Sequence, residues 1–178
     1  MKKLLLSAII TSTIGVMASP ALAATTVTVN GGSVNFEGAV VNAACGVDSS
    51  SSNQTVRLGQ FRVAEFTAKG DETGRIPFSI KLNNCDTTVS ANAAITFNGT
   101  ASTDANAFAL QGADAAENIA LKITDSTNTV VVPNNASTTQ KLIDGENQLN
   151  YNASLISTED TVKAGSANVT TNFMVTYS

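Results

Sequence analysis

The sequence predicts an all-β protein built as an antiparallel β-sandwich. Short stretches with apolar residues at every second position recur along the chain, the clearest being Ile76 to Leu82. Turn-forming pairs such as Asn98-Gly99 separate these stretches. The chain is also rich in Thr and Val, which favour strands, and in Asn, Ser and Gly, which favour turns. Many short strands at this spacing are typical of a sandwich.

The expected strands in the first part of the chain end at recognisable signals. Residues 34–41 lead into Cys45, and residues 76–82 alternate up to Asn83-Asn84. Residues 93–97 stop at Asn98-Gly99. A short strand is expected at 55–58, and one helical turn is expected between Arg62 and Ala68.

The second part continues the same pattern. Residues 108–110 form a short segment, and residues 119–123 alternate before Asp125. Residues 130–132 stop at Pro133, which cannot donate to a ladder. Residues 149–155 alternate after Asp144-Gly145, and residues 173–177 form the last strand. With 178 residues and no internal repeat, the chain fits one domain with a real core.

The first 23 residues read as an export signal. Met1-Lys2-Lys3 is a charged start, Leu4 to Val16 is an apolar run, and Ala21-Leu22-Ala23 is an Ala-x-Ala cleavage site. The run is too short, and too interrupted by Ser and Thr, to span a bilayer. We expect cleavage between Ala23 and Ala24. Because this removes two lysines and no acidic residue, the net charge falls from −4 to −6, which disfavours nucleic-acid binding.

The two cysteines, Cys45 and Cys85, lie 40 residues apart. In an exported protein, the oxidising compartment favours a disulfide between them. Free thiols and metal ligation are the alternatives, although two cysteines without any histidine cannot form a zinc site of the usual type.

The chain lacks the parts that most enzymes need. It has no histidine, so the commonest general base and the commonest metal ligand are missing, and no Ser-His-Asp or Cys-His arrangement can form. It also has no glycine-rich phosphate loop. Acidic pairs such as Asp71-Glu72 and Glu159-Asp160 lie in polar stretches without flanking aromatics, so we interpret them as solvated turns rather than glycosidase carboxylates. We predict no enzyme activity, cofactor, metal site or small-molecule substrate.

Both ends of the exported chain have features suited to pairing with another chain. Near the N-terminus, one strand face carries four residues at every second position: Gly32, Val34, Phe36 and Gly38. Near the C-terminus, Phe173, Val175 and Tyr177 share one face of the last expected strand. An exposed apolar edge is a hazard in a monomer and a binding site in an assembly, although ordinary terminal strands show the same pattern.

Four segments resemble the major subunits of type 1 fimbriae in the fimbrial protein family. They are VNGGSVNFEGAVVNAAC at 29–45, QTVRLGQ at 54–60, FSIKLNNCD at 78–86 and FMVTY at 173–177. The segments occur in the family's order and include its cysteine spacing, so the resemblance covers the whole exported chain.

The resemblance implies an immunoglobulin-like sandwich over residues 39–178 that lacks its final strand, preceded by a donor-strand extension over residues 24–38. A periplasmic chaperone lends the missing strand, and at the outer-membrane usher the extension of the next subunit replaces it. By this resemblance, Val34 and Phe36 fill apolar pockets, and Gly32 lies where the groove is too shallow for a side chain. Phe173, Val175 and Tyr177 line the groove and meet the chaperone, and the cysteines link the first strand to the third.

The function implied is that of a shaft subunit. The chain would pass through the periplasm to the cell surface and polymerise head to tail with its own copies and with tip or adaptor subunits, forming a fimbria that supports adhesion. A minor adaptor subunit is one alternative. A carbohydrate-binding tip adhesin is another, but the exported chain has no room for the extra lectin domain that such adhesins carry.

Overall fold

The computed structural model describes residues 26–178, so the expected signal peptide and the Ala23–Ala24 cleavage site lie outside the described residues. The chain divides into two units, residues 1–38 and residues 39–178. Within the first unit, residues 26–38 are exposed and form no strand. The strand expected at 34–41 is therefore absent from this single chain, because a strand requires a partner for its backbone groups.

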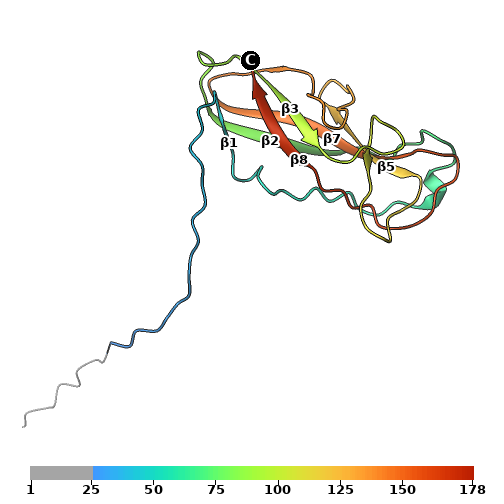
Figure 1. Ribbon diagram of the computed structural model, residues 1–178, viewed down its shortest axis with the longest axis horizontal. Coiled ribbons are helices and arrows are strands. Elements are labelled where there is room, and N and C mark those ends of the chain that lie inside the picture. The colour runs from blue at the N-terminus through green and yellow to red at the C-terminus, as the bar shows by residue number, and fades with distance from the viewer. Residues whose placement is uncertain (1–25) are drawn as a thin grey trace, which may run out of the picture. The chain divides into compact units, whose positions relative to one another are not determined.

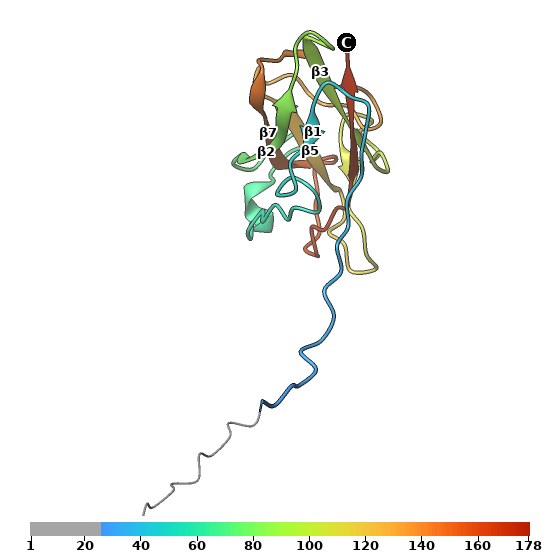
Figure 2. The same cartoon turned by 90° about the vertical axis from the view of Figure 1, so that its left-hand side faces the viewer.

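The second unit consists of two antiparallel sheets (Figures 1 and 2). The larger sheet has five strands in the order β1-β2-β7-β5-β4, with bounds Gly46–Val47, Ile76–Cys85, Gly145–Ser157, Ile119–Asp125 and Phe108–Ala109. The smaller sheet has three strands in the order β6-β3-β8, with bounds Gln140–Lys141, Asn92–Asn98 and Asn172–Tyr177. The predicted all-β antiparallel sandwich is thus confirmed.

The core lies between the two sheets, where the alternating apolar residues of facing strands meet. On β2, Ile80 and Leu82 are almost fully buried, and Ile80 lies opposite Leu149 of β7 in the ladder. Ile95 and Phe97 of β3 enter the core from the smaller sheet. This period of two is what the sequence predicted for both strands.

Most of the expected strands are present. The stretches predicted at 76–82, 93–97, 119–123, 149–155 and 173–177 lie within β2, β3, β5, β7 and β8, and the helical turn near Arg62 is a 3-10 helix, η1, at Val63–Glu65. The strand predicted at 55–58 is wrong, since residues 54–60 have no strand assignment, and that at 130–132 is reduced to one isolated bridge at Val130. Among residues 26–178, no helix is long and apolar enough to cross a membrane.

Cys45 and Cys85 form the predicted disulfide. Both are buried, with relative exposures of 3% and 6%. Because residues 55–58 form no strand, the bond joins the residue before β1 to the last residue of β2, which are neighbouring strands. The expected link from the first strand to the third is therefore wrong, and the disulfide links the first strand, β1, to the second, β2.

Candidate strand-accepting groove

β8 forms one edge of the smaller sheet and has β3 as its only strand partner among the described residues. Asn92 and Ser178 exchange both backbone hydrogen bonds, at 3.0 and 3.1 Å. In an antiparallel ladder, hydrogen-bonded pairs alternate with non-bonded pairs, so Thr176 and Met174 also bond to β3. The N–H and C=O groups of the intervening residues, Phe173, Val175 and Tyr177, therefore point toward the open edge.

The same three residues turn their side chains inward but remain only half-buried, whereas the alternate residues of β8 are exposed. Met174, for example, is 57% exposed on the outer face. Inward side chains of a completed sandwich are normally buried, so the half-burial marks a place where the core is uncovered. The sequence-predicted groove residues thus present both apolar side chains and backbone groups that have no ladder partner among the described residues along one edge.

Aromatic rings form part of this uncovered region. Phe97 of β3 is 3% exposed, and its ring centroid lies 5.9 Å from that of Phe78 of β2 and 6.4 Å from that of Phe173 of β8. Phe78 and Phe173 come from different sheets, and both are half-buried. We call this opening, lined by Phe78, Phe173, Val175 and Tyr177, the groove.

At one end of the groove, the last strand is tied to the first. The Tyr177 hydroxyl donates to the Cys45 carbonyl oxygen at 3.1 Å. Burial raises the pKa of Tyr177, so its hydroxyl stays protonated and remains a donor. Since Cys45 is also disulfide-bonded to Cys85, the end of β8 is attached to both β1 and β2.

At the other end, a cavity of about 420 Å³ opens between two loops. Residues 59–66, which include η1, form one wall, and residues 162–168 before β8 form the other. Its lining includes Phe66, Ile119 and Leu155, all of them buried core residues. The cavity is therefore apolar at its base and large enough for a side chain.

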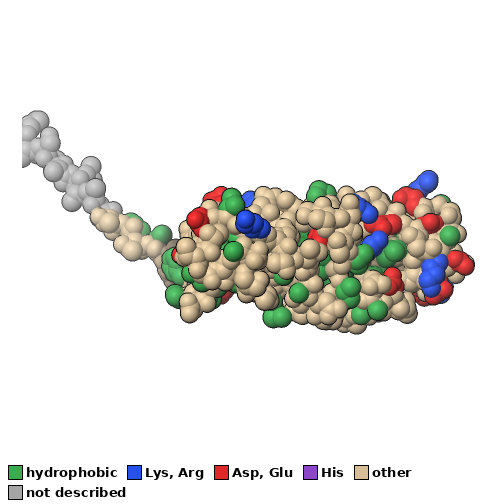
Figure 3. Space-filling view, turned by 90° about the horizontal axis from the view of Figure 1, so that it is seen from above, with side chains coloured by type: hydrophobic (Ala, Val, Ile, Leu, Met, Phe, Trp, Pro, Cys, Tyr) green, Lys and Arg blue, Asp and Glu red, His purple; other side chains and the backbone are tan. Residues whose placement is uncertain are grey.

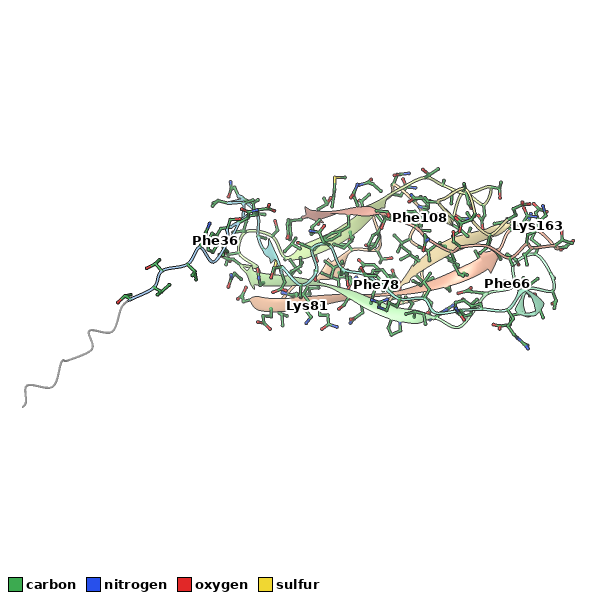
Figure 4. The ribbon with its side chains drawn as sticks, turned by 90° about the horizontal axis from the view of Figure 1, so that it is seen from below. Phe36, Phe66, Phe78, Lys81, Phe108 and Lys163 are labelled. Atoms are coloured by element: carbon green, nitrogen blue, oxygen red, sulfur yellow. A yellow bond between two sulfur atoms is a disulfide. The ribbon has the colours of Figure 1, made fainter. Side chains whose placement is uncertain are left out.

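The loop walls of the cavity are close-packed and charged on the outside. A Cβ on Gly165 would overlap the backbone of Ala116, and it would lie 2.5 Å from the Asp114 carbonyl oxygen. Exposed ion pairs surround this end, including Lys163–Glu117 at 2.5 Å and Lys69–Glu159 at 3.4 Å. Figure 3 shows acidic and basic side chains intermixed there, and Figure 4 shows Phe66 and Lys163 at the same end. Such exposed pairs contribute little stability.

The sequence reasoning missed the cavity. Its lining comes from loops without apolar periodicity, and only the bulky residues Phe61, Phe66 and Val162 within otherwise polar stretches were available as signals. It also missed Phe78 as a groove residue, because Phe78 reads as an ordinary core position of its strand.

The expected donor residues lie in the first unit, on a segment without a strand partner among residues 26–178. Val34 is 76% exposed, and Phe36, which is labelled in Figure 4, is 91% exposed. Gly32 has a φ of +113°, in the region that favours glycine, and a Cβ on Gly32 or Gly38 would meet no atom within 4 Å.

The chemistry that this arrangement offers is recognition of an extended chain. A strand placed beside β8 would satisfy the outward backbone groups of three residues and cover the half-buried side chains beneath them. Within residues 26–178, no group of three or more Cys, Asp and Glu side chains is arranged to hold a metal ion. The fold thus offers a candidate site for another protein chain at the open edge of the sandwich.

Known proteins are similar to this chain in sequence. A family model described as fimbrial protein matches residues 34–178. The fimbrial subunit type 1 of Salmonella typhimurium is 42% identical over 180 residues, covering 95% of this chain and 97% of that protein. The type-1 fimbrial protein A chain of Escherichia coli K12 is 39% identical, covering 99% and 100%. The chain therefore belongs to the fimbrial protein family, and it is a structural pilus subunit.

Solved structures agree with the fold. A chaperone-usher pilus studied for the uncoiling of its rod superposes with a TM-score of 0.73 at 25% identity, covering 87% of this chain and 100% of that chain. The P pilus rod subunit PapA superposes with a TM-score of 0.67 at 23% identity, covering 76% and 100%. The likeness confirms the expected immunoglobulin-like sandwich.

Proposed function

We propose that this pilus subunit polymerises head to tail by donor-strand exchange, with residues 24–38 of one copy completing the groove of another. The observation that carries the proposal is the state of β8, where Phe173, Val175 and Tyr177 have outward backbone groups and half-buried side chains. The extension provides the matching part, since Val34 and Phe36 alternate on one strand face and are exposed. The extension and the groove are both present in one chain, so each copy donates one strand to a neighbour and accepts one strand from another.

Such a head-to-tail contact joins different surfaces of the two copies, so it continues from copy to copy and generates a filament. Main-chain hydrogen bonds to β8 give the contact its strength, and the alternating apolar side chains fix its register. Gly32 and Gly38 would occupy positions of the groove with no depth for a side chain. The role requires no catalysis, and we propose none for this chain.

The same groove explains the need for helper proteins. Before assembly, an uncovered apolar edge would aggregate, so a periplasmic chaperone would lend a strand to β8, and an outer-membrane usher would bring the next extension to it. We propose that the exported chain follows this route to the cell surface, where it meets copies of itself and tip or adaptor subunits. We propose the shaft role for the chain, because a donor extension and a groove in one chain allow each copy to be followed by another copy.

The test is a single charge on the donor face. Phe36→Asp should bury an unpaired carboxylate in the groove and block polymerisation, because burial of an unpaired charge is strongly unfavourable. Asn35→Asp adds the same charge on the opposite face of the same strand and is the matched control. Electron microscopy measures filament formation by both variants. Recovery of the chaperone-bound subunit checks that each variant folds.

Deletion of residues 24–38 provides a second test. The truncated chain should still form a chaperone complex, since its groove is intact, but it should be unable to complete another copy. Filaments of normal length built from the truncated chain alone would contradict donor-strand exchange. In wild-type cells, filaments whose mass consists mainly of this chain would identify the shaft, whereas a trace at the tip would identify the adaptor.

A further inference from the structure

We infer that Asn30 is a site of spontaneous deamidation in the unassembled subunit, whereas the second Asn-Gly pair of the chain, at Asn98, is protected by the fold. The two pairs, Asn30-Gly31 and Asn98-Gly99, are the same dipeptide. The first lies in an exposed segment without a strand, and the second lies at the end of a strand. The consequence for assembly, considered below, rests on the proposed function.

The chemistry of an Asn-Gly pair requires only water. The backbone nitrogen of the glycine attacks the Cγ atom of the asparagine side chain, the Cγ–Nδ2 bond breaks, and ammonia leaves with the proton of the attacking amide. Water then opens the resulting succinimide at either carbonyl, which gives aspartate or isoaspartate. The reaction is fastest before glycine, because no Cβ hinders the attacking nitrogen, and it requires a backbone that is free to bring nitrogen and Cγ together.

Asn30-Gly31 meets both requirements. Both residues are exposed, and a Cβ on Gly31 would meet no atom within 4 Å. Among the described residues, the Gly31 N–H donates no hydrogen bond. The Asn30 side chain is already turned along its own backbone, because its Oδ1 atom accepts a hydrogen bond from the Gly32 N–H at 3.2 Å.

Asn98-Gly99 fails the second requirement. Asn98 is the last residue of β3 and is paired with Asn172 of β8. The Gly99 N–H donates to Asn134 Oδ1 at 3.1 Å, and the Asn134 side-chain amide returns a bond to the Gly99 carbonyl at 3.0 Å. A Cβ on Gly99 would lie 2.9 Å from the Phe108 ring, so this segment is also held by packing. The attacking nitrogen at this pair is therefore engaged and fixed.

The position of Asn30 gives the reaction a functional consequence. Asn30 shares strand parity with Gly32, Val34 and Phe36, so it lies on the face that the proposed donor strand turns toward the groove. Aspartate would place a negative charge on that face, and isoaspartate would add a backbone methylene and break the hydrogen-bond register. Subunits that deamidate before assembly would thus become poorer strand donors. A donor strand already paired in a filament would be held rigid, which would protect its Asn30 from deamidation.

The experiment compares the two pairs within one molecule. The oxidised mature chain, kept unassembled as its chaperone complex, is aged in mildly alkaline buffer and digested. The mass gain that marks replacement of an amide by a carboxyl is followed for each Asn-Gly peptide. We expect conversion at Asn30 to be at least about fivefold faster than at Asn98, the ratio that the net contribution of one intact hydrogen bond supports. Gly31→Ala should slow conversion at Asn30 and leave Asn98 unchanged. Equal rates at the two sites, or faster conversion at Asn98, would overturn the inference.

Assembled filaments separate this inference from the proposed function. If Asn30 converts in the free subunit and is spared in filaments, the deamidation site and the placement of residues 24–38 in the groove are both supported. If Asn30 converts in filaments as fast as in the free subunit, the deamidation site stands, and the placement of residues 24–38 in the groove fails. If Asn30 is inert in the free subunit, the inference fails while the donor placement is untouched. Asn30→Asp should lower filament yield relative to Asn35→Asp.

Discussion

Tyr177 and Cys45 lie 132 residues apart in the sequence, and the Tyr177 hydroxyl donates to the Cys45 carbonyl oxygen at 3.1 Å. This bond joins β8 to the residue that precedes β1, at the end of the groove opposite the cavity. It therefore holds together two chain segments that belong to different sheets and have no ladder between them.

Tyr177→Phe removes only this hydroxyl. We expect the complemented subunit, meaning residues 39–178 with residues 24–38 appended after Ser178 through a Gly/Ser linker, to lose about 1 kcal/mol of unfolding free energy. Urea unfolding measures the loss. Met174→Ala, on the exposed face of the same strand, should change stability less, and an equal loss in both variants would show that the hydroxyl has no specific role.

The disulfide should contribute more than any single hydrogen bond. It closes a loop with a sequence separation of 40 residues. Chain entropy predicts that the Cys45→Ser, Cys85→Ser double variant loses about 4 kcal/mol in the complemented subunit. Because both sulfurs are buried, a thiol reductant should open the bond only under conditions that also unfold the domain. Rapid reduction of the folded subunit, detected by thiol labelling, would contradict this expectation.

Gly165 should be essential for the shape of the cavity. In Gly165→Ala, the new Cβ would overlap the backbone of Ala116 and lie 2.5 Å from the Asp114 carbonyl oxygen, so the loop must move. We expect a loss of about 1–3 kcal/mol in the complemented subunit. The same change should also weaken binding of a peptide of residues 24–38 to the chaperone-released subunit. Gly74→Ala is the matched control, since its Cβ would meet no atom within 4 Å and its φ is not positive.

Acid should weaken the outer face of the larger sheet through Glu72. Burial alone would raise the pKa of Glu72, but hydrogen bonds from Lys122, at 2.8 Å, and from Ser154, at 2.7 Å, outweigh it and hold that pKa below its usual value. A lowered folded-state pKa gives stability that is present above the ordinary carboxyl pKa and is lost as pH falls through the lowered value.

The variant Glu72→Gln tests this dependence. It should lose about 1 kcal/mol at neutral pH and less in acid, so the two stability curves should converge as pH falls. Glu146→Gln, at an exposed position of β7, serves as the control and should leave the acid dependence of the complemented subunit in place. Parallel curves for wild type and Glu72→Gln would rule out a contribution from this carboxylate.

The longer strands could be predicted from the sequence because their apolar alternation reflects burial on one face. Ile76 to Leu82 and residues 149–155 show this clearly, since Ile80 and Leu149 meet in the core. The strands β1 and β6 have two residues each, too few for any periodicity. Residues 34–41 have the alternating pattern of a strand but form no strand. Such a pattern shows that a segment can pair with another strand, but it does not show that a partner strand is present.

The site was predictable along β8 but not at its two ends. Alternation placed Phe173, Val175 and Tyr177 on one strand face, and the family resemblance implied their groove role. The structure gives these residues half-buried side chains and outward backbone groups. The Tyr177–Cys45 bond and the cavity depend on contacts between distant segments, which no local pattern records. Phe78 was hidden for a related reason, since its half-burial depends on what covers its side chain in space rather than on its own sequence context.

The disulfide also has a mechanical consequence. If donor strands hold the filament together as proposed, tension on a subunit enters the sandwich at Ala44 and Cys45, the first buried residues after the extension. The β1 strand is only two residues long, and its ladder would shear under a modest pull. The covalent bond instead transmits the force to Cys85 at the end of β2, whose ten residues run antiparallel to the thirteen-residue β7. The bond thus spares a ladder of only two residue pairs by directing tension into the β2–β7 ladder, the longest of the described residues.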